Sequence, residues 1–114
     1  MSNDSTLPIE ITVADLDAMR ARGDNFVLLD VREASEYETA RIEGSKLLPM
    51  SEIQQRLSEL DEHQQDHIVV QCHHGGRSMQ VTEFLRSKGF GKVQNLAGGI
   101  DQWSLQIDSS VPRY

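Results

Sequence analysis

The chain has 114 residues, of which 38% are hydrophobic, and its formal net charge is −7, from 11 Lys and Arg against 18 Asp and Glu. This length suffices for a single domain, residues 1–114, with its own core, and no apolar run is long enough for a membrane span. An acidic chain without a basic stripe repels phosphate backbones, so we expect neither nucleic acid nor a membrane as a partner.

The first residues and the cysteine count bear on the compartment. The stretch MSNDSTLP has no basic region followed by an apolar segment, so it does not resemble a secretory signal. A single cysteine allows no internal disulfide, which fits a reducing environment. We therefore expect a cytoplasmic protein.

Short apolar runs alternate with amphipathic stretches along the first half of the chain. Residues 9–12 (IEIT) predict a brief strand, and Thr12 with Asp15 resembles a capping pair for a helix that stops near Gly23. Residues 26–30 (FVLLD) form an uninterrupted apolar run, as in a strand covered on both faces. The stretch EASEYETA predicts a short helical turn, and SKLLP a short strand.

A third helix is predicted next, with Ser51 and Gln54 as its capping pair. Its apolar face would consist of three residues at spacings of four and three: Ile53, Leu57 and Leu60.

The second half repeats the alternation of strands and helices. HIVVQ (residues 67–71) and KVQNL (residues 92–96) predict strands. The first of these strands is followed by a predicted helix from about Ser78 that stops at Gly89. The second is followed by a glycine turn into a last short helix, AGGIDQWSLQ. Such alternation favours a parallel α/β sheet with helices on both faces, in which ligands bind at the carboxyl ends of the strands. Cys72 lies there, directly after HIVVQ.

The stretch QCHHGGRSMQ around Cys72 has the composition of a reactive thiol site. A thiol is a useful nucleophile only as thiolate, so its ordinary pKa of about 8.5 must be lowered by positive charge or aligned dipoles. Gly75 and Gly76 allow the backbone to turn its N–H groups inward, a helix begins there, and Arg77 adds a permanent charge. We expect an anion cradle around the sulfur and a lowered thiol pKa.

Two other interpretations of these residues are weaker. A buried structural cysteine is common, but a Gly-Gly-Arg loop is poor core material. Zinc ligation by His73 and His74 with His63 and His67 is disfavoured, because adjacent histidines tend to point apart and HQQDH lies in a polar stretch. We expect no metal, with His73 and His74 at the pocket rim and the other two histidines on the surface.

Loop length separates the chemistries that use such a cradle. Cysteine-dependent phosphatases have five residues between Cys and Arg, whereas four separate Cys72 from Arg77 here. A shorter ring suits a smaller guest, such as one sulfur atom on the cysteine. The sequence therefore favours sulfur transfer over phosphate ester hydrolysis or arsenate reduction.

Three motifs in order carry a family resemblance. CHHGGRS is similar to the active-site loop of single-domain rhodaneses, which are thiosulfate:cyanide-type sulfurtransferases. LLDVREASEYETARIEGS resembles the Asp-Val-Arg-Glu segment of that family, and VQNLAGGIDQW its Leu-x-Gly-Gly-x-x-x-Trp ending. Two departures are Ala34, where many members have Pro, and Arg41, where a His is usual. Arg41 cannot titrate near neutrality.

The resemblance implies a three-layer fold with a central parallel sheet of about five strands and no cofactor. It implies that Cys72 is the persulfide-forming nucleophile and that Asp30 and Arg32 support the site. The substrate-binding residues that it implies are His73, His74, Gly75, Gly76, Arg77 and Ser78.

The implied reaction is a double displacement. The Cys72 thiolate takes a sulfur from a small anionic donor such as thiosulfate, and an acceptor then removes it. Because the chain has no second cysteine, the acceptor must be external: cyanide, a small thiol or a thioredoxin-like protein. The alternative is a non-enzymatic sulfur-relay or protein-interaction module of the same family.

Overall fold

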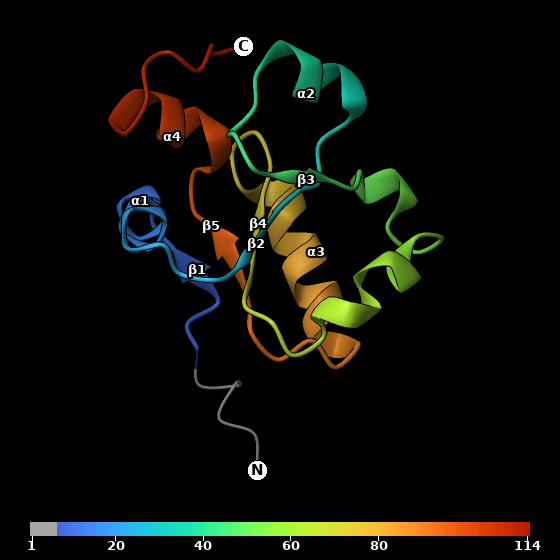
Figure 1. Ribbon diagram of the computed structural model, residues 1–114. Helices are drawn as coiled ribbons and strands as arrows, with labels where there is room; N and C mark the ends of the chain where they lie inside the picture. The colour runs from blue at the N-terminus through green and yellow to red at the C-terminus, as the bar shows by residue number, and fades with distance from the viewer. Residues whose placement is uncertain (1–6) are drawn as a thin grey trace.

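The computed structural model describes residues 7–114 of the chain (Figure 1). Residues 1–6, which include most of the stretch that was compared with a secretory signal, lie outside the described residues. Within residues 7–114, none of the helices has the length and apolar character needed to cross a membrane.

A five-stranded sheet runs through the centre of the molecule. Its strands are β1 (Glu10–Ile11), β2 (Val27–Asp30), β3 (Lys46–Leu47), β4 (Ile68–Gln71) and β5 (Val93–Leu96). The spatial order is β1-β5-β4-β2-β3, and every neighbouring pair is parallel. The parallel sheet of about five strands expected from the sequence is therefore confirmed.

Helices cover both faces of the sheet, as expected. The α-helices are α1 (Val13–Arg22), α2 (Ala34–Thr39), α3 (Gly76–Ser87) and α4 (Gly99–Gln106). α1 and α4 contact each other on one face, α3 packs against β4 and β5 on the other, and α2 lies beyond the end of the sheet (Figure 1). This arrangement produces three layers.

The local signals at α1 are confirmed. The Thr12 hydroxyl accepts the Asp15 N–H and the Asp15 carboxylate accepts the Thr12 N–H, both at 3.1 Å, which is a complete capping box. The helix ends at Gly23, whose φ of 73° is the left-handed conformation that favours glycine.

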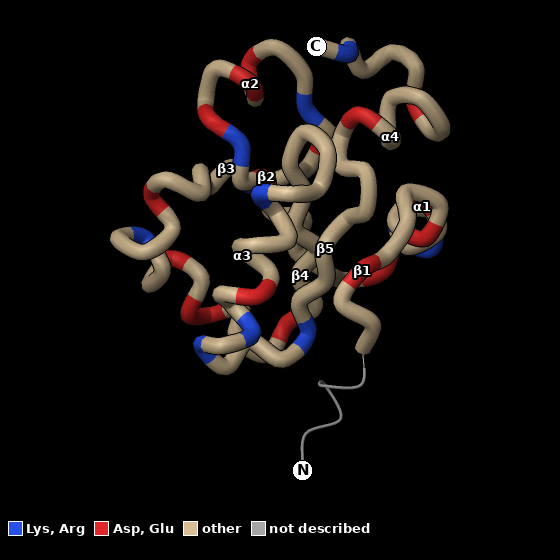
Figure 2. The backbone as a smooth tube through the Cα atoms, turned by 180° about the vertical axis from the view of Figure 1, so that it is seen from behind, with Lys and Arg blue, Asp and Glu red and all other residues tan. Residues whose placement is uncertain are grey.

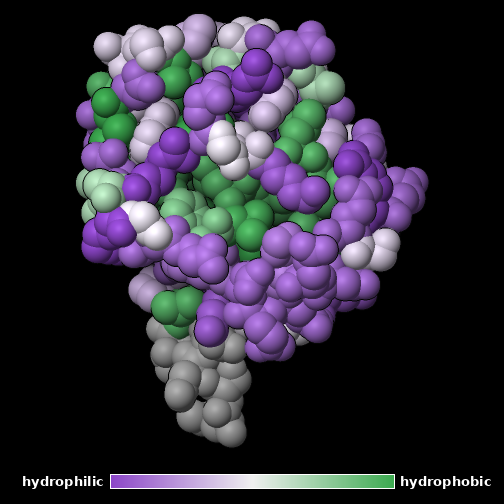
Figure 3. Space-filling view, in the orientation of Figure 1, coloured by the Kyte–Doolittle hydropathy of each residue, from purple (hydrophilic) through white to green (hydrophobic). Residues whose placement is uncertain are grey.

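Two apolar clusters, one on each side of the sheet, make up the core. The cluster under α3 includes Leu29, Val70, Cys72, Val81 and Leu85. The cluster under α1 and α4 includes Leu16, Leu28, Val69, Ile100 and Trp103. Hydrophilic residues cover most of the face shown in Figure 3, and hydrophobic residues show mainly in the floor of a central hollow.

The predicted third helix is wrong. The chain instead forms two 3₁₀ segments, η2 (Met50–Glu52) and η3 (Leu57–His63). The Ser51 hydroxyl donates to the Glu33 carboxylate at 3.1 Å, and no cap to Gln54 forms. Ile53 and Leu60 are still buried, so the apolar spacing predicted correctly which side chains are buried but not the type of helix.

All strands point the same way, so their carboxyl ends share one edge of the sheet. The segments after β2, β4 and β5 and the helix α2 meet beyond this edge (Figure 1). Figure 2 shows acidic and basic residues interspersed around the molecule, with both signs at this end.

Candidate active site

Cys72 follows the last residue of β4 and is held inside the edge of the sheet. Its side chain is 1% exposed and belongs to the apolar cluster under α3. Gly75, with a φ of 108°, turns the backbone into α3, which begins at Gly76. The strand, tight loop and helix start that the sequence predicted are therefore all in place.

The Cys72 sulfur is surrounded by hydrogen-bond donors. Its Sγ accepts the Gly75 N–H at 3.1 Å and the Ser78 N–H at 3.4 Å. The Ser78 Oγ lies 3.3 Å from the same sulfur. The first turn of α3 thus directs its N–H groups at the position where thiolate charge develops.

These donors lower the pKa of the Cys72 thiol. Burial by itself raises this pKa, and it is the largest individual influence. The Ser78 hydroxyl and the backbone N–H groups of Ser78, Gly75 and His74 together outweigh burial, because each stabilises the thiolate. The lowered thiol pKa expected from the sequence is borne out.

The start of α4 holds the same loop by hydrogen bonds to its backbone carbonyls. The Ile100 N–H donates to the Cys72 carbonyl at 2.9 Å, and the Asp101 N–H to the His73 carbonyl at 3.1 Å. Gly99, with a φ of 59°, is the first residue of α4 and lies directly against these carbonyls. The Gly-Gly turn before α4 is therefore part of the scaffold of the Cys72 loop.

Arg77 is bound by an acidic residue from another element. Its guanidinium donates to both carboxylate oxygens of Glu36 on α2, at 2.7 and 2.8 Å. This bidentate pair, helped by Tyr114 and a backbone N–H, lowers the pKa of Glu36 to about 2 although burial opposes it. An anionic donor that reaches Arg77 must therefore compete with Glu36 for it.

Asp30 and Arg32 form an ion pair that is 0% exposed at the end of β2. The Arg32 guanidinium also donates to the Ala40 carbonyl at 2.6 Å and to the Tyr114 hydroxyl at 2.9 Å. The Tyr114 hydroxyl in turn donates to Glu36 at 2.8 Å. Hydrogen bonds therefore connect the end of β2 to Arg77 through Tyr114 and Glu36, which supports a scaffolding role for Asp30 and Arg32.

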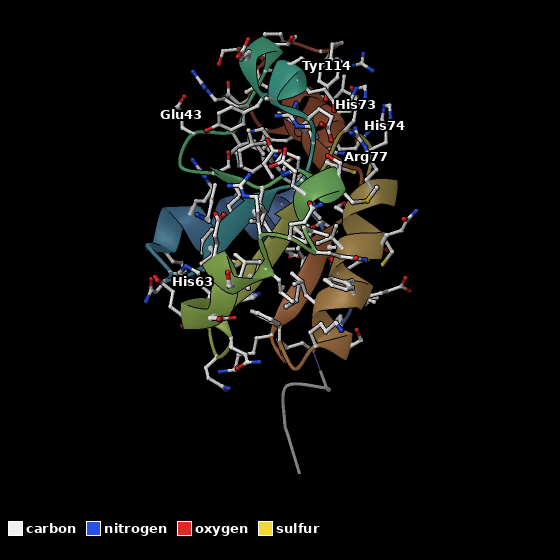
Figure 4. The ribbon with its side chains drawn as sticks, turned by 90° about the vertical axis from the view of Figure 1, so that its right-hand side faces the viewer. Glu43, His63, His73, His74, Arg77 and Tyr114 are labelled. Atoms are coloured by element: carbon white, nitrogen blue, oxygen red, sulfur yellow. The ribbon has the colours of Figure 1, made fainter. Side chains whose placement is uncertain are left out.

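His73 and His74 do not point apart, contrary to the expectation from their adjacency. Their rings stack with centroids 3.9 Å apart, and the Tyr114 ring stacks on His73 at the same distance. Figure 4 shows His73, His74, Arg77 and Tyr114 together at the end of the molecule where α3 begins. The aromatic ring of Tyr114 gives His73 a flat surface to stack on. Tyr114 lies far from His73 in the sequence, so the local pattern could not predict this contact.

His73, His74 and Asp101 bring their possible ligand atoms within 4.8 Å of one another. The planes of the two imidazole rings differ by only 26°, and their centroids are 3.9 Å apart. The nitrogen lone pairs lie in these planes, so they can meet only at a point much farther from the rings than the metal–nitrogen distance of about 2 Å. Asp101 is already paired with Arg113 at 2.8 Å. This geometry does not favour a metal, and the absence of one stays a prediction.

The other two histidines lie away from this end. Figure 4 places His63 far from the stacked rings, and its Nδ1 lies 2.9 Å from Asp66. His67 is half-buried, with its Nε2 2.7 Å from Gln94. Arg41 lies over the Tyr37 ring at 4.9 Å, a surface cation–π contact in place of the histidine usual in the family.

Several residues of the site escaped the sequence analysis. They are Glu36 on α2, Asn95 on β5, Asp101 on α4, and Arg113 and Tyr114 after α4. Glu36 and Arg77 are separated by 41 residues, and Arg32 and Tyr114 by 82. No spacing rule connects residues so far apart, so only tertiary packing could reveal them.

A cysteine that directly follows a parallel strand, accepts N–H groups from the start of the next helix and is separated from an arginine by four residues defines a cysteine-dependent anion-cradle domain. The sequence pattern of one family, described as the Rhodanese-like domain, matches residues 12–106. The chain belongs to this rhodanese-like family.

Individual relatives agree with this assignment. A sulfurtransferase from Allochromatium vinosum is 34% identical over 95 residues, which cover 83% of this chain and 87% of that protein. The putative sulfur carrier protein YrkF of Bacillus subtilis is 35% identical over 102 residues, 90% of this chain. The chain spans 54% of the length of YrkF and under a third of several other curated relatives.

Solved structures carry the same fold. The crystal structure of a rhodanese-like domain protein from Staphylococcus aureus superposes with a TM-score of 0.79 at 25% sequence identity. The match covers 94% of this chain and 99% of that one.

Proposed function

We propose that this protein is a sulfurtransferase that carries a sulfane sulfur on Cys72 from thiosulfate or a similar donor to a thiophilic acceptor. The observation that carries the proposal is the N–H cradle around the Cys72 sulfur, with only four residues between Cys72 and Arg77. The sulfurtransferase among its relatives supports the same chemistry.

The first step forms the persulfide. The Cys72 thiolate attacks the outer sulfur of thiosulfate, the sulfur–sulfur bond of the donor breaks, and sulfite leaves with the bonding electron pair. The Gly75 and Ser78 N–H groups stabilise the thiolate before the attack. Arg77 at the loop's end attracts the anionic donor.

The second step returns the thiolate. An external nucleophile attacks the outer sulfur of the persulfide, and the bond to Cys72 breaks with its electron pair left on Cys72. Cyanide gives thiocyanate, and a thiolate acceptor gives a new persulfide. The acceptor is external because the chain contains no second cysteine.

Intact-protein mass measurement after thiosulfate treatment tests this proposal. The wild type is expected to gain the mass of one sulfur atom and to lose it again when cyanide is added. Cys72→Ser, checked for folding by circular dichroism, gains nothing. An adduct on Cys72→Ser, or none on the wild type with any of several sulfane donors, would contradict the proposal.

A sulfur-relay module is the second candidate, and the relative named as a sulfur carrier favours it. The burial of Cys72, at 1% exposure, fits a sulfur that is handed over within a closed contact. Turnover kinetics separate the two functions. A relay module is expected to load one sulfur but to produce no thiocyanate in the steady state. An enzyme is expected both to load the sulfur and to produce thiocyanate continuously.

Arg77 and Glu36 allow a prediction about donor recognition. Arg77→Ala removes the cation that attracts the donor, so it is expected to raise the KM for thiosulfate about tenfold, the size of one charge-assisted hydrogen bond. The competing Glu36 carboxylate keeps the effect from being larger. Glu36→Gln frees the guanidinium and lowers that KM about threefold. Steady-state kinetics measure both changes.

The rate of alkylation by iodoacetamide, a neutral reagent, serves as the control for thiol reactivity. It should change far less than the KM for thiosulfate in either variant. Equal thiosulfate kinetics in wild type and Arg77→Ala would remove Arg77 from donor binding.

A further inference from the structure

The Ser78 hydroxyl lies between two groups that can each take its single proton. Ser78 is 0% exposed, and its Oγ is 3.3 Å from the Cys72 sulfur. On its other side, the same hydroxyl donates to Oδ1 of Asn95, a residue of β5 that is 1% exposed. A hydroxyl has one proton, so it cannot donate in both directions at once.

The orientation of the Asn95 amide is set by its other contacts. Its Nδ2 donates to the Glu10 carboxylate at 3.0 Å and to the Gly75 carbonyl at 3.2 Å. Both partners can only accept, so the amide nitrogen must face them and the oxygen must face Ser78. The Asn95 oxygen is itself only an acceptor and therefore holds the Ser78 proton.

The two charge states of Cys72 need different positions of that proton. A thiol can donate its S–H to the Ser78 oxygen while Ser78 donates to Asn95, so every group is paired. A thiolate has no proton to give and needs the Ser78 hydroxyl to turn toward it. The Asn95 oxygen is then left without a partner in a buried position, which is costly.

We propose that Asn95 is a positioning residue that competes with the Cys72 sulfur for the Ser78 proton and so opposes formation of the thiolate. Ionisation sends the Cys72 proton to solvent, while the Ser78 O–H bond stays intact and only rotates. This proposal rests on the proposed function only in naming the thiolate as the attacking form.

The competition is expected to relax once sulfur is loaded. In a persulfide the negative charge lies on the outer sulfur, and the inner sulfur bonded to Cys72 is uncharged. The Ser78 hydroxyl can then return to Asn95 Oδ1. Asn95 thus favours the loaded state and opposes the free thiolate.

Other charged and titratable groups contact this hydrogen-bonded chain or pair with residues beside it. They are Glu10 on β1, His73 and His74 in the loop, Arg77 on α3, Glu36 on α2 and Asp101 on α4. None of these residues is replaced in the Asn95 and Ser78 variants, although Glu10 loses the N–H of Asn95 in Asn95→Leu. The effect of Asn95→Leu with and without the Ser78 hydroxyl therefore isolates the part that acts through that hydroxyl.

The test is an ultraviolet titration of the thiolate in the free protein, without any sulfur donor. Asn95→Leu keeps the side-chain size and removes the competing acceptor, so the titration midpoint is expected to fall by about one pH unit. Ser78→Ala removes a donor to the thiolate and raises the midpoint. The double variant is expected to match Ser78→Ala, because Asn95 acts only through Ser78.

Two outcomes would overturn the proposal: an unchanged midpoint in folded Asn95→Leu, or an equal fall in the Ser78→Ala background. The second would mean that Asn95 acts by holding the Gly75 carbonyl. Glu10→Gln is the matched control, since it alters the charge next to Asn95 but can still accept its N–H, and its midpoint should stay at the wild-type value.

If Asn95→Leu does not fold, Asn95→Asp in the Glu10→Gln background replaces it. That variant keeps an acceptor for Ser78 and gives the new carboxylate an amide partner. Its midpoint is expected above that of Glu10→Gln, and the rise is expected to be smaller when Ser78→Ala is added. An equal rise with and without Ser78 would be charge repulsion alone and would overturn the proposal. Failure of sulfur loading in the mass experiment leaves this titration unaffected, so the two proposals fail separately.

Discussion

Arg32→Met is expected to lower the free energy of unfolding by about 3 to 5 kcal/mol, the usual cost of breaking a buried ion pair by removing one partner. Both Asp30 and Arg32 are 0% exposed, and the guanidinium donates to the carboxylate at 2.7 and 3.0 Å. Methionine fills the space of the Arg32 stem but leaves the Asp30 carboxylate buried without its countercharge. The Ala40 carbonyl loses its donor as well.

Urea unfolding followed by circular dichroism measures this change. Asp30→Leu combined with Arg32→Met is expected to recover part of the loss, because no unpaired charge then remains inside. Arg22→Met is the matched control: Arg22 pairs with Asp24 at 2.6 Å on the surface, and its loss should leave the unfolding midpoint in place. A loss as small for Arg32→Met as for Arg22→Met would contradict the buried pair.

Gly99→Ala is the second change with a large expected effect. A Cβ at Gly99 would lie 2.3 Å from the Cys72 carbonyl oxygen and 2.6 Å from the His73 carbonyl oxygen, both backbone atoms that cannot turn aside. The φ of 59° adds the strain of a left-handed alanine. We expect a loss of about 3 kcal/mol in stability and, because the Cys72 loop must shift, a fall of about 100-fold in the rate of sulfur loading.

Gly44→Ala is the control that separates the backbone strain of a positive φ from the steric clash of the new Cβ. Gly44 also has a positive φ, of 86°, but within residues 7–114, its two chain neighbours aside, no heavy atom lies within 4 Å of the position that its Cβ would take. It should cost only about 1 kcal/mol and leave the loading rate at the wild-type value. If Gly99→Ala behaved as mildly as Gly44→Ala, the contact between the start of α4 and the Cys72 loop would not support the site.

Both changes act on the scaffold of the site and not on the sulfur itself. Arg32 connects the end of β2 to Glu36 through Tyr114, and Gly99 allows α4 to donate to the Cys72 loop. The rigid support of an otherwise short loop explains how a small domain can hold backbone N–H groups against one sulfur. This support comes from the strand and helix ends that converge on one edge of the sheet (Figure 1).

Local chemistry explains which predictions were correct. The capping box at Thr12, the stop at Gly23 and the buried strand β4 depend on neighbouring residues, so the pattern of a short stretch is sufficient. The helix predicted from Ser51 failed because its cap depends on a distant residue. Glu33 takes the Ser51 hydroxyl, and the segment forms 3₁₀ turns that still bury Ile53 and Leu60.

The sequence by itself determined the alternation of strands and helices, the place of Cys72 after β4 and the four residues that separate Cys72 from Arg77. These features depend on contacts within a few residues, where hydrophobic period and turn chemistry act directly. Only the tertiary structure decided what surrounds the cysteine: the Glu36 carboxylate on Arg77, the Tyr114 ring on His73 and the Asn95 amide on Ser78. These pairs join elements far apart in the chain, and parallel strands bring such elements together only when the whole sheet has formed.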